Sequence, residues 1–423
     1  MKSAFLIAAT SSGCGKTTLS LGLMRALIRK HVSIQPFKCG PDYIDTQFQS
    51  IAAERESINL DLFMSSDSHV RALFSLYSED SDVSIVEGVM GMFDGFDKMK
   101  GSSADVAHIL DIPVILLINA ASTAYSVAAT IYGFTHFCPD VKIAGVIFNR
   151  VASENHFSFL KKACADVGVE CFGYLKKNEA LQTPSRHLGL TLSSREVMNR
   201  FIDMAADEVE KNVEMERLLK ATSLTEAPQK EKLKISVLSD FTVAVARDEA
   251  FSFIYPANLK TFGKIVYFSP IHDSHLPAAD LVYLPGGYPE LFADKLSENI
   301  NLRNEIKAFA ENGGRILAEC GGLIYLCEAI DGQKMCGIFP MKATMNDSKL
   351  SLGYRRIDFP HATLKGHEFH YSHIIAPLSI SGIATQQNVK GQKIETPVYR
   401  YKNTIAGYTH LYWAETDILK LWK

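Results

Sequence analysis

The chain has 423 residues, of which 47% are hydrophobic and 22% are charged, and its formal net charge is -3 at pH 7. This length exceeds that of one ordinary domain and predicts two, with ample apolar residues for a core in each. The small negative charge gives no electrostatic reason to expect nucleic acid as a partner, and no apolar run approaches the length of a membrane span.

The cysteines indicate the compartment. The 8 cysteines are scattered and include no C-x-x-C pair. This pattern predicts free thiols in a reducing cytoplasm and argues against a disulfide framework or a zinc site. The apolar run that follows Met1 is short and leads directly into a glycine-rich loop, so we do not interpret it as a signal peptide.

That loop is the first functional signal in the chain. Residues 4–8 are an apolar run typical of a buried strand, and residues 19–27 are apolar at helical spacing. Between them stands Thr-Ser-Ser-Gly-Cys-Gly-Lys-Thr-Thr at positions 10–18. A strand, a glycine turn and a helix in this order predict a phosphate-binding loop, and they disfavour a chance Gly-Lys-Thr in an ordinary turn. One departure is Thr10, because the plain pattern has glycine there.

The residue types in the loop suit a nucleotide phosphate. Gly13 and Gly15 allow the backbone N–H groups to turn inward, where the helix N-terminus adds partial positive charge. Lys16 is expected to reach the β- and γ-phosphates, and the hydroxyl of Thr17 is a candidate ligand of Mg²⁺. Thr18 completes the predicted nucleotide-binding set.

Two further predicted strands end in charged residues. The strand at 33–38 ends at Lys38 and leads into a Gly/Pro loop that holds Asp45. Lys38 is a candidate for a phosphate or a substrate carboxylate, and Asp45 for Mg²⁺ or substrate, although an ordinary solvated loop is an equal alternative. The strand at 83–86 is followed by Glu87, which is typical of a Walker-B acid near Mg²⁺.

Strands and helices continue to alternate to the middle of the chain, which predicts a parallel, doubly wound α/β sheet. Asn149 follows one of these strands and is a candidate for the adenine edge or, alternatively, a turn residue. The polar stretch at 222–233 lacks periodicity and is interpreted as a linker between domains at 1–221 and 234–423. The elements expected here are helices at 103–110, 124–134 and 194–220 and strands at 113–119 and 143–148.

The second half contains a candidate nucleophile, Cys320. A strand at 315–319 runs into Cys-Gly-Gly and then a helix at 323–329, which predicts an elbow that raises the thiol above the sheet. We expect the helix N-terminus to lower the pKa of this thiol, and the N–H groups of Gly287 and Gly321 to form an oxyanion hole. The alternative is a small buried hydrophobe at a turn. Other expected elements are strands at 234–238 and 281–284 and helices at 250–255 and 257–262.

A thiolate nucleophile needs a general base. His410 follows a predicted strand at 404–407 and is one candidate. His367 and His370 lie in a second histidine-containing segment and are rivals. Sequence spacing leaves the choice among the three open.

Together these segments resemble the cobyrinate a,c-diamide synthases over nearly the whole chain. The N-terminal half is similar to dethiobiotin synthetase, which implies a P-loop NTPase-like parallel sheet, and the C-terminal half is similar to class I glutamine amidotransferases, which implies a second α/β domain. The family usually has Thr at the position of Thr10. The matching segments are 10–18, Pro-Phe-Lys-Cys-Gly-Pro-Asp-Tyr-Ile-Asp (36–45), Val-Glu-Gly-Val-Met-Gly (86–91), Leu-Pro-Gly-Gly-Tyr-Pro-Glu (284–290), Ala-Glu-Cys-Gly-Gly (318–322), Gly-His-Glu-Phe-His-Tyr-Ser (366–372) and Tyr-Thr-His (408–410).

The resemblance implies a cytoplasmic ligase that uses ATP, Mg²⁺ and L-glutamine to amidate the a and c carboxylates of a corrinoid acid in cobalamin biosynthesis. Ammonia released at Cys320 would attack an acyl phosphate formed with ATP. The resemblance selects His410 as the base, although Tyr412 stands where class I amidotransferases usually have the glutamate of the triad. The remaining implied roles are phosphate binding by Lys16 and Lys38, Mg²⁺ binding by Thr17, Asp45 and Glu87, and adenine contact by Asn149.

Other functions stay open at this point. The same motifs suit amidation of hydrogenobyrinate or nickel-sirohydrochlorin. A P-loop switch ATPase is a different class, but Thr10-Ser11-Ser12 lacks the extra lysine of that class and Cys320 would have no purpose there. A stand-alone glutaminase with a regulatory nucleotide domain is a further alternative. A homodimer is one of the assemblies compatible with the sequence.

Overall fold

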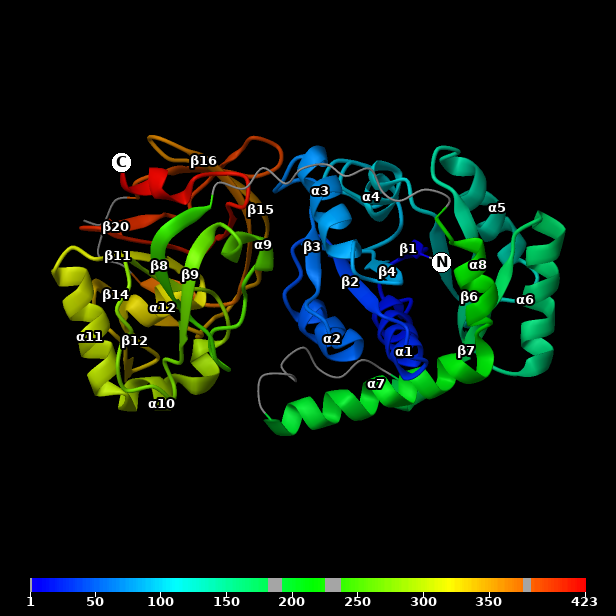
Figure 1. The fold of residues 1–423 in the computed structure, drawn as a ribbon, viewed down its shortest axis with the longest axis horizontal. Helices are drawn as coiled ribbons and strands as arrows, with labels where there is room; N and C mark the ends of the chain where they lie inside the picture. Colours follow the sequence, from blue (N-terminus) through cyan, green and yellow to red (C-terminus); the bar gives the residue numbers. More distant parts are fainter. Residues whose placement is uncertain (1, 182–191, 225–236, 376–381) are drawn as a thin grey trace. The chain divides into compact units, whose positions relative to one another are not determined.

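The computed structural model describes residues 2–181, 192–224, 237–375 and 382–423. The chain divides into two compact units, Met1–Leu233 and Lys234–Lys423 (Figure 1). Both are α/β, as the sequence predicts, and each has its own main sheet.

The first unit is built on a seven-stranded sheet with the order β3-β2-β4-β1-β5-β6-β7, in which every pairing is parallel. The strands are almost continuously apolar and buried, as expected for a parallel sheet covered on both faces. They are β1 (Ser3–Ala9), β2 (Ile34–Cys39), β3 (Ile58–Leu60), β4 (Val83–Glu87), β5 (Val114–Asn119), β6 (Ile143–Val151) and β7 (Cys171–Lys176).

Helices cover both faces of this sheet. The first two crossovers run toward the β3 edge and the next four run toward β7, so right-handed connections place α1 and α2 on one face and α3 to α6 on the other. The core on the first face also includes α7 and α8. The helices are α1 (Lys16–Arg29), α2 (Ile44–Ala53), α3 (Asp67–Ser78), α4 (Ser103–Leu110), α5 (Val127–Phe137), α6 (Glu154–Val167), α7 (Leu192–Asn212) and α8 (Met215–Ala221), with a 3-10 turn η1 (Glu179–Leu181).

The strand order determines where the candidate residues meet. β1 and β2 both pair with β4, and in the registers Ile7 lies opposite Glu87 and Lys38 lies opposite Glu87 on the other side. The carboxyl ends of these three strands therefore carry the glycine-rich loop, Lys38 and Glu87 to the same edge of the sheet. Open α/β sheets bind ligands at this edge.

The long helix predicted at 194–220 is in fact two helices, α7 and α8. The helix is interrupted at Val213, which forms an isolated β-bridge with Gly173. The N–H of the next residue, Glu214, donates to the carbonyl of Phe172 (2.8 Å). A Cβ on Gly173 would lie 2.1 Å from the carbonyl oxygen of Asn212, so glycine is needed for this close approach. Apolar residues recur at helical spacing on both sides of the break, which is why the sequence predicts one helix.

The second unit has a central six-stranded sheet with the order β20-β21-β11-β10-β8-β9, parallel except for β20. Its apolar residues form separate cores on the two faces. The strands are β8 (Leu238–Ala246), β9 (Phe262–Phe268), β10 (Leu281–Leu284), β11 (Arg315–Glu319), β20 (Tyr399–Tyr401) and β21 (Thr404–Gly407), and the helices are α9 (Pro256–Leu259), α10 (Ala293–Glu298), α11 (Ile300–Glu311) and α12 (Gly321–Leu326), with 3-10 turns η2 (Pro289–Phe292) and η3 (Ile418–Trp422).

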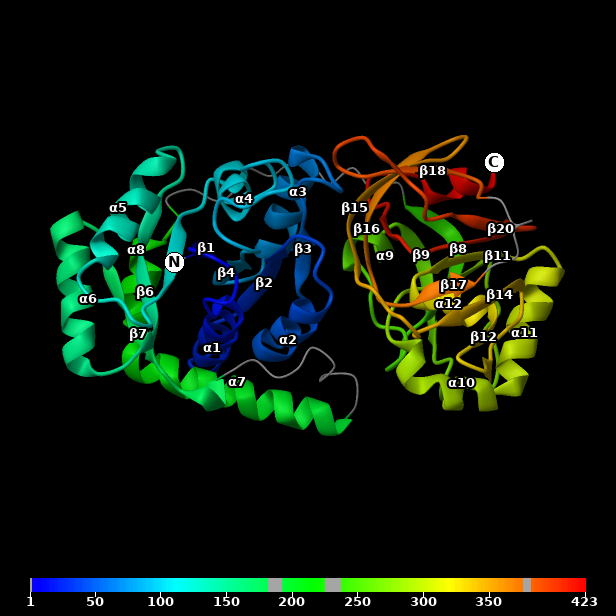
Figure 2. The same ribbon diagram turned by 180° about the vertical axis from the view of Figure 1, so that it is seen from behind.

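Two smaller sheets were not predicted from the sequence. One has the order β13-β12-β14-β17, and the other is antiparallel with the order β19-β18-β15-β16-β22, in which β15 and β16 lie side by side (Figure 2). Their strands are β12 (Cys327–Ile330), β13 (Gln333–Lys334), β14 (Phe339–Thr344), β17 (His373–Ile375), β15 (Ser351–Asp358), β16 (Thr363–His370), β18 (Thr385–Gln387), β19 (Lys393–Ile394) and β22 (His410–Tyr412).

One helix prediction in this unit is wrong, and another is too long. Residues 250–255 form a loop, because the carboxylate of Asp248 accepts the N–H groups of Ala250 and Phe251 and the N–H groups of the next two residues pair with Gly286. The helix expected at 323–329 ends at Leu326, because Cys327 begins β12 and pairs with β14.

The predicted linker falls mostly outside the described residues. Its first residues contact the first unit: the hydroxyl oxygens of Ser3 and Thr222 are 2.6 Å apart, and the N–H of Leu224 donates to the carbonyl of Lys2. All the cysteines lie in described ranges and are free thiols, as the sequence predicts. Among the helices described, none combines the length and the apolar character that crossing a membrane requires.

The contact of α1 with α7 gives a prediction about stability. A Cβ on the buried Gly22 of α1 would lie 2.7 Å from the carbonyl oxygen of Ala205 and 2.9 Å from a methyl group of Val209. Gly22→Ala must therefore separate the helices, which we expect to cost about 1–3 kcal/mol and to lower the thermal midpoint measured by circular dichroism. Gly133→Ala in α5 is the matched control, because no atom lies within 4 Å of its Cβ position. The control should be neutral or stabilising by up to about 1 kcal/mol, and equal effects of the two substitutions would contradict this packing.

Candidate functional site

One cavity in the first unit collects every nucleotide and metal candidate of that half. Its volume is about 930 Å³, and it lies at the carboxyl ends of the central strands. Residues that sequence reasoning did not single out also line it, among them Arg150, Lys176 and Lys177. The predicted residues that line it are Gly13, Gly15, Lys16, Thr17, Thr18, Lys38, Asp45, Glu87 and Asn149.

The turn of the glycine-rich loop depends on Gly15. Its φ is +99°, in the left-handed region that favours glycine, and a Cβ there would lie 2.2 Å from the side-chain nitrogen of Asn149. That nitrogen donates to the carbonyl of Cys14 (2.7 Å), while the amide oxygen of Asn149 accepts the N–H of Arg150 (2.8 Å). In this structure the Asn149 amide therefore supports the loop backbone, and its predicted contact with adenine stays a prediction.

Lys16 and Thr18 are both held by backbone carbonyls. The ammonium of Lys16 donates to the carbonyls of Met90 and Ser11. Burial and the neighbouring Lys38 lower the pKa of Lys16. The hydroxyl of Thr18 donates to the carbonyl of Leu181 (3.2 Å), so this side chain ties α1 to η1. A phosphate with acceptor oxygens would replace the carbonyl acceptors of Lys16.

Lys38 lies between two carboxylates. Its ammonium is 2.5 Å from Asp45 and 2.7 Å from Glu87, and the lysine and Glu87 are almost completely buried. Burial by itself lowers the pKa of Lys38, but the two carboxylates outweigh burial and raise it. The lysine is therefore charged. It also shows that the two acids together stabilise a cation at this place.

The oxygen atoms of Thr17, Asp45 and Glu87 converge. The hydroxyl of Thr17 is 2.9 Å from Glu87 and 3.4 Å from Asp45. Hydroxyl and carboxylate oxygens are the donors that Mg²⁺ prefers, and it takes its other ligands from water and phosphate. The described residues contain no group of three or more His, Cys, Asp or Glu able to hold a metal. This donor set therefore fits Mg²⁺ bound together with a nucleotide.

Gln49 is a residue that sequence reasoning missed. It lies on α2 and is fully buried, and its side-chain nitrogen donates to the second carboxylate oxygen of Glu87 (2.8 Å). Its own oxygen accepts the hydroxyl of Ser57 (2.6 Å). With one oxygen of Glu87 held by Gln49, the other faces Thr17 and Lys38. The sequence analysis expects no helix at these residues, so no signal marks Gln49 before the fold is known.

In the second unit, Cys320 stands at the predicted elbow between β11 and α12. Its φ is +49° and its ψ is -104°, which is strained for any residue other than glycine. Its N–H donates to the carbonyl of Gly407 (2.8 Å), and its sulfur lies 3.9 Å from the carbonyl oxygen of Phe369. The strand-turn-helix geometry agrees with a nucleophile elbow.

The pKa expected for this thiol is wrong. Burial raises the pKa of Cys320 well above its ordinary value, with further contributions from Glu290 and Glu368, and the N–H of Gly321 only partly opposes them. α12 is short, so the stabilisation that its N-terminus offers a thiolate does not compensate for burial. The resting form of Cys320 is therefore the neutral thiol.

The two glycines of the predicted oxyanion hole lie together. A Cβ on Gly321 would be 3.1 Å from the backbone nitrogen of Gly287, and a Cβ on Gly287, whose φ is +158°, would be 2.0 Å from the carbonyl oxygen of Ala250. Backbone approaches this close require glycine at both positions. The backbone nitrogen of Gly287 thus lies close to Gly321, the residue after Cys320, and the oxyanion hole stays a prediction.

The three candidate histidines lie on two adjacent strands. His367 on β16 faces His410 on β22 in register. The ring of His370 stacks on Tyr408 with centroids 3.7 Å apart, and its Nδ1 lies 2.8 Å from the carbonyl of Ser372. Burial, together with His367 and His370, lowers the pKa of His410 to about 3, so its imidazole is neutral at pH 7. The fully buried ring also packs against Gly286, where a Cβ would be 2.1 Å from Cε1.

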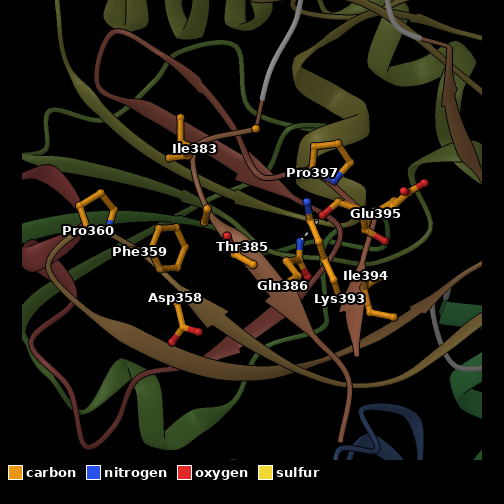
Figure 3. A pocket seen from close by; sticks show the side chains of 13 residues that line it. Asp358, Phe359, Pro360, Ile383, Thr385, Gln386, Lys393, Ile394, Glu395 and Pro397 are labelled. Carbon is orange, nitrogen blue, oxygen red and sulfur yellow. Dashed lines mark hydrogen bonds between the residues drawn. The ribbon is translucent and has the colours of Figure 1, made fainter. Parts of the chain in front are cut away.

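A second cavity, of about 620 Å³, lies elsewhere in this unit (Figure 3). Its polar lining includes Asp358, Gln386, Lys393 and Glu395. None of the residues predicted for the nucleophile, base or oxyanion hole lines it. The chemistry inferred from the sequence therefore does not use this cavity.

Comparisons with known proteins agree with this division. The family of CobQ/CobB/MinD/ParA nucleotide binding domains matches residues 5–190, and the family of CobB/CobQ-like glutamine amidotransferase domains matches residues 242–418. The cobyrinate a,c-diamide synthase of Streptococcus sanguinis is 40% identical over 98% of this chain and 97% of that relative, and that of Caldanaerobacter subterraneus is 38% identical over 96% and 94%. A solved glutamine amidotransferase is 17% identical over 40% of this chain and 89% of its own, with a TM-score of 0.28.

The raised pKa of Cys320 predicts slow modification at neutral pH. Alkylation by iodoacetamide requires the thiolate, whose fraction falls as the pKa rises above the ambient pH. We expect Cys320 to be labelled far more slowly than the less buried Cys138 at pH 7, with a rate that still increases between pH 8 and 10. Mass spectrometry of peptides from the folded protein measures both rates. Faster labelling of Cys320 than of Cys138 at pH 7 would contradict a buried neutral thiol.

Proposed function

Because this chain belongs to the cobyrinate a,c-diamide synthase family, we propose that it amidates the a and c carboxylates of cobyrinate in cobalamin biosynthesis. Like its relatives it is a glutamine-dependent amidating ligase. The observation that carries the choice of substrate is the match to these relatives along almost the whole chain, nucleotide-binding and amidotransferase parts included. The eight free thiols suit a reducing cytoplasm, where we propose that the protein acts.

The first unit activates the carboxylate in this proposal. A carboxylate oxygen of the substrate attacks the γ-phosphorus of ATP, and the bond to ADP breaks, which gives an acyl phosphate. Lys16 and Lys38 offset the charge of the transferring group, and the backbone N–H groups at Gly13 and Gly15 cradle the phosphates. Thr17, Asp45 and Glu87 are the proposed holders of Mg²⁺, which when bound neutralises phosphate charge. Ammonia then attacks the acyl carbon, phosphate leaves, and the amide remains.

The second unit supplies the ammonia. Cys320 and His410 both rest in neutral forms, so His410 takes the thiol proton as the sulfur attacks the side-chain carbonyl carbon of glutamine. The N–H groups of Gly287 and Gly321 stabilise the oxyanion. The C–N bond breaks, the proton on His410 goes to the departing ammonia, and water hydrolyses the thioester to glutamate. The burial of His410 beside Gly286, where a Cβ would lie 2.1 Å from Cε1, supports this assignment, because the ring is shielded from water.

Three substitutions test whether the two units act independently. We expect Cys320→Ala to lose amidation with glutamine and to keep amidation with ammonium at raised pH, because free ammonia does not need the thiol. His410→Ala should behave in the same way. Lys16→Ala should lose both activities, because either nitrogen source needs the acyl phosphate. Each variant is incubated with cobyrinate, ATP, Mg²⁺ and one nitrogen source, and mass spectrometry measures the amides formed. Hydrogenobyrinate and nickel-sirohydrochlorin are tested as substrates in parallel.

The outcomes separate the proposal from its rivals. If the wild-type protein adds amides to another tetrapyrrole and not to cobyrinate, that tetrapyrrole is the substrate and the proposed one is wrong. A Cys320→Ala variant that still uses glutamine, or that fails equally with ammonium, would refute the proposed role of the second unit. A glutaminase without any amidation product would refute the ligase reaction on this substrate.

The metal assignment gives a separate prediction. Asp45→Asn and Glu87→Gln should each raise the Mg²⁺ concentration needed for half-maximal ammonia-dependent amidation by about 10-fold or more, because each removes a charged oxygen donor. Calorimetric titration of Mg²⁺ into the protein with ATP should show the same weakening. Asp80→Asn is a suitable control, because this exposed acid precedes β4 whereas Glu87 ends it. An unchanged Mg²⁺ requirement in both site variants would show that the metal binds elsewhere.

A further inference from the structure

The strand that carries His410 is held on one edge by side chains. β22 is the last strand of its sheet and pairs with β16. Toward the other edge, the N–H of Leu411 donates to Glu319 (3.0 Å), and the carbonyl of Leu411 accepts the side-chain nitrogen of Asn258 (2.8 Å). The N–H of Trp413 donates to the side-chain oxygen of Asn258 (2.8 Å). Two side chains thus take the place of a neighbouring strand.

Glu319 is an unusual residue for this task. It immediately precedes Cys320, and only 2% of its surface is exposed. One carboxyl oxygen accepts the N–H of Leu411, and the other accepts the hydroxyl of Tyr283 (2.8 Å), which is itself buried. Burial raises the pKa of Glu319 to about 8. A buried carboxyl group of this kind is costly, so a packing role alone would be met better by an apolar side chain.

We propose that Glu319 is the positioning residue of the glutamine site: its hydrogen bond to the N–H of Leu411 fixes β22 and thereby sets His410 relative to Cys320. This inference rests on the proposed function, in which His410 is the base. In class I amidotransferases a glutamate at the position of Tyr412 usually orients the histidine. We assign this orienting role to Glu319, the residue before the nucleophile. Glu319 acts through the backbone of the residue after His410 and does not touch glutamine.

The surroundings of His410 make its position sensitive to this bond. The ring packs against Gly286 and lies with its centroid 5.9 Å from that of Phe253. The preceding residue is also clamped, because the hydroxyl of Thr409 is bonded to Glu368 (3.0 Å) and Gln386 (3.1 Å). The backbone is therefore fixed on both sides of the base. Displacement of a reacting group by about 1 Å costs about 10²-fold in rate.

The test compares variants that keep or remove the acceptor for Leu411. Glu319→Met has a similar shape and lacks the acceptor, whereas Glu319→Gln keeps an oxygen that can accept the same N–H. In the full-length protein, we expect Glu319→Met to lower kcat for glutamate release from glutamine by about 10- to 100-fold with KM within about 3-fold, because the base is displaced while the binding groups remain. Glu319→Gln should restore most of the rate.

Tyr283→Phe is the matched control. It removes the other hydrogen bond of the same carboxyl group, in the same buried place, and leaves the bond to Leu411. We expect it to keep kcat within about 2-fold. Glu319→Asp is a second test if the methionine variant does not fold, because the shorter acid withdraws the acceptor from Leu411 and should lower kcat in the same way.

Ammonia-dependent amidation and the thermal midpoint report folding in every variant, and both should stay near wild type where kcat falls. Full kcat in Glu319→Met, or a loss confined to KM, would overturn the proposal. An equal loss of kcat in Tyr283→Phe would also overturn it, because any disturbance of the buried Glu319 and Tyr283 pair would then lower the rate, whether or not the bond to Leu411 remains. Glutamate release is measured without the tetrapyrrole, so a wrong substrate assignment would leave this result intact, whereas glutaminase activity that survives Cys320→Ala would refute the proposed function itself.

Discussion

A carboxyl group buried at the end of a strand must be matched by fixed hydrogen-bonding partners, because a buried polar group without partners is too costly to keep. Each unit of this protein depends on such a group. Glu87 ends β4 and is matched by Thr17, Lys38 and Gln49, which come from three different elements. The requirement to satisfy one carboxylate therefore holds the phosphate loop, the second strand and α2 in a single geometry, and that geometry is the candidate nucleotide site.

The same constraint operates differently in the second unit. Glu319 ends β11, next to the strained Cys320, and its donors are a tyrosine hydroxyl and a backbone N–H. Neither of these donors is a cation, so burial raises the pKa of Glu319. In the first unit, by contrast, Lys38 forms ion pairs with two carboxylates, which raise its pKa and keep it charged. In the proposed mechanism, the first unit uses the Glu87 carboxylate to arrange charged groups around a phosphate. The second unit uses the Glu319 carboxyl group, whose pKa is raised by burial, to align two strands that carry the proposed reactive groups.

Much of the first unit could be predicted from the sequence because its signals are local. The phosphate loop, Lys38 and Glu87 each stand at or directly after the end of an apolar strand, and parallel strands bring their carboxyl-terminal residues to one edge. Gln49 could not be predicted, since its function depends on a contact with a residue 38 positions away. The break between α7 and α8 was missed for the same reason, because Gly173 and Val213 meet only in the folded chain.

The second unit was harder to predict because its site is made of long-range pairings. The strand, turn and helix at Cys320 are contiguous and were recognised, but β16 and β22 are separated in the chain by about 40 residues and meet only in the antiparallel sheet. Several strands of the two smaller sheets are too short to show a pattern: β13 and β19 have only 2 residues each.

The wrong pKa for Cys320 follows from the same limitation. A helix N-terminus is visible in a sequence, whereas the degree of burial is not, and here burial dominates. The raised pKa of this thiol also affects the proposed mechanism. A thiol with a raised pKa holds its proton until attack begins, so in the proposed mechanism the transfer of this proton to the neutral His410 accompanies bond formation. Such a transfer depends on the relative placement of donor and acceptor more than a preformed ion pair would, because no electrostatic attraction holds the two groups together beforehand. The glutamine site therefore needs a rigid support behind its base, and the side-chain contacts along β22 provide one.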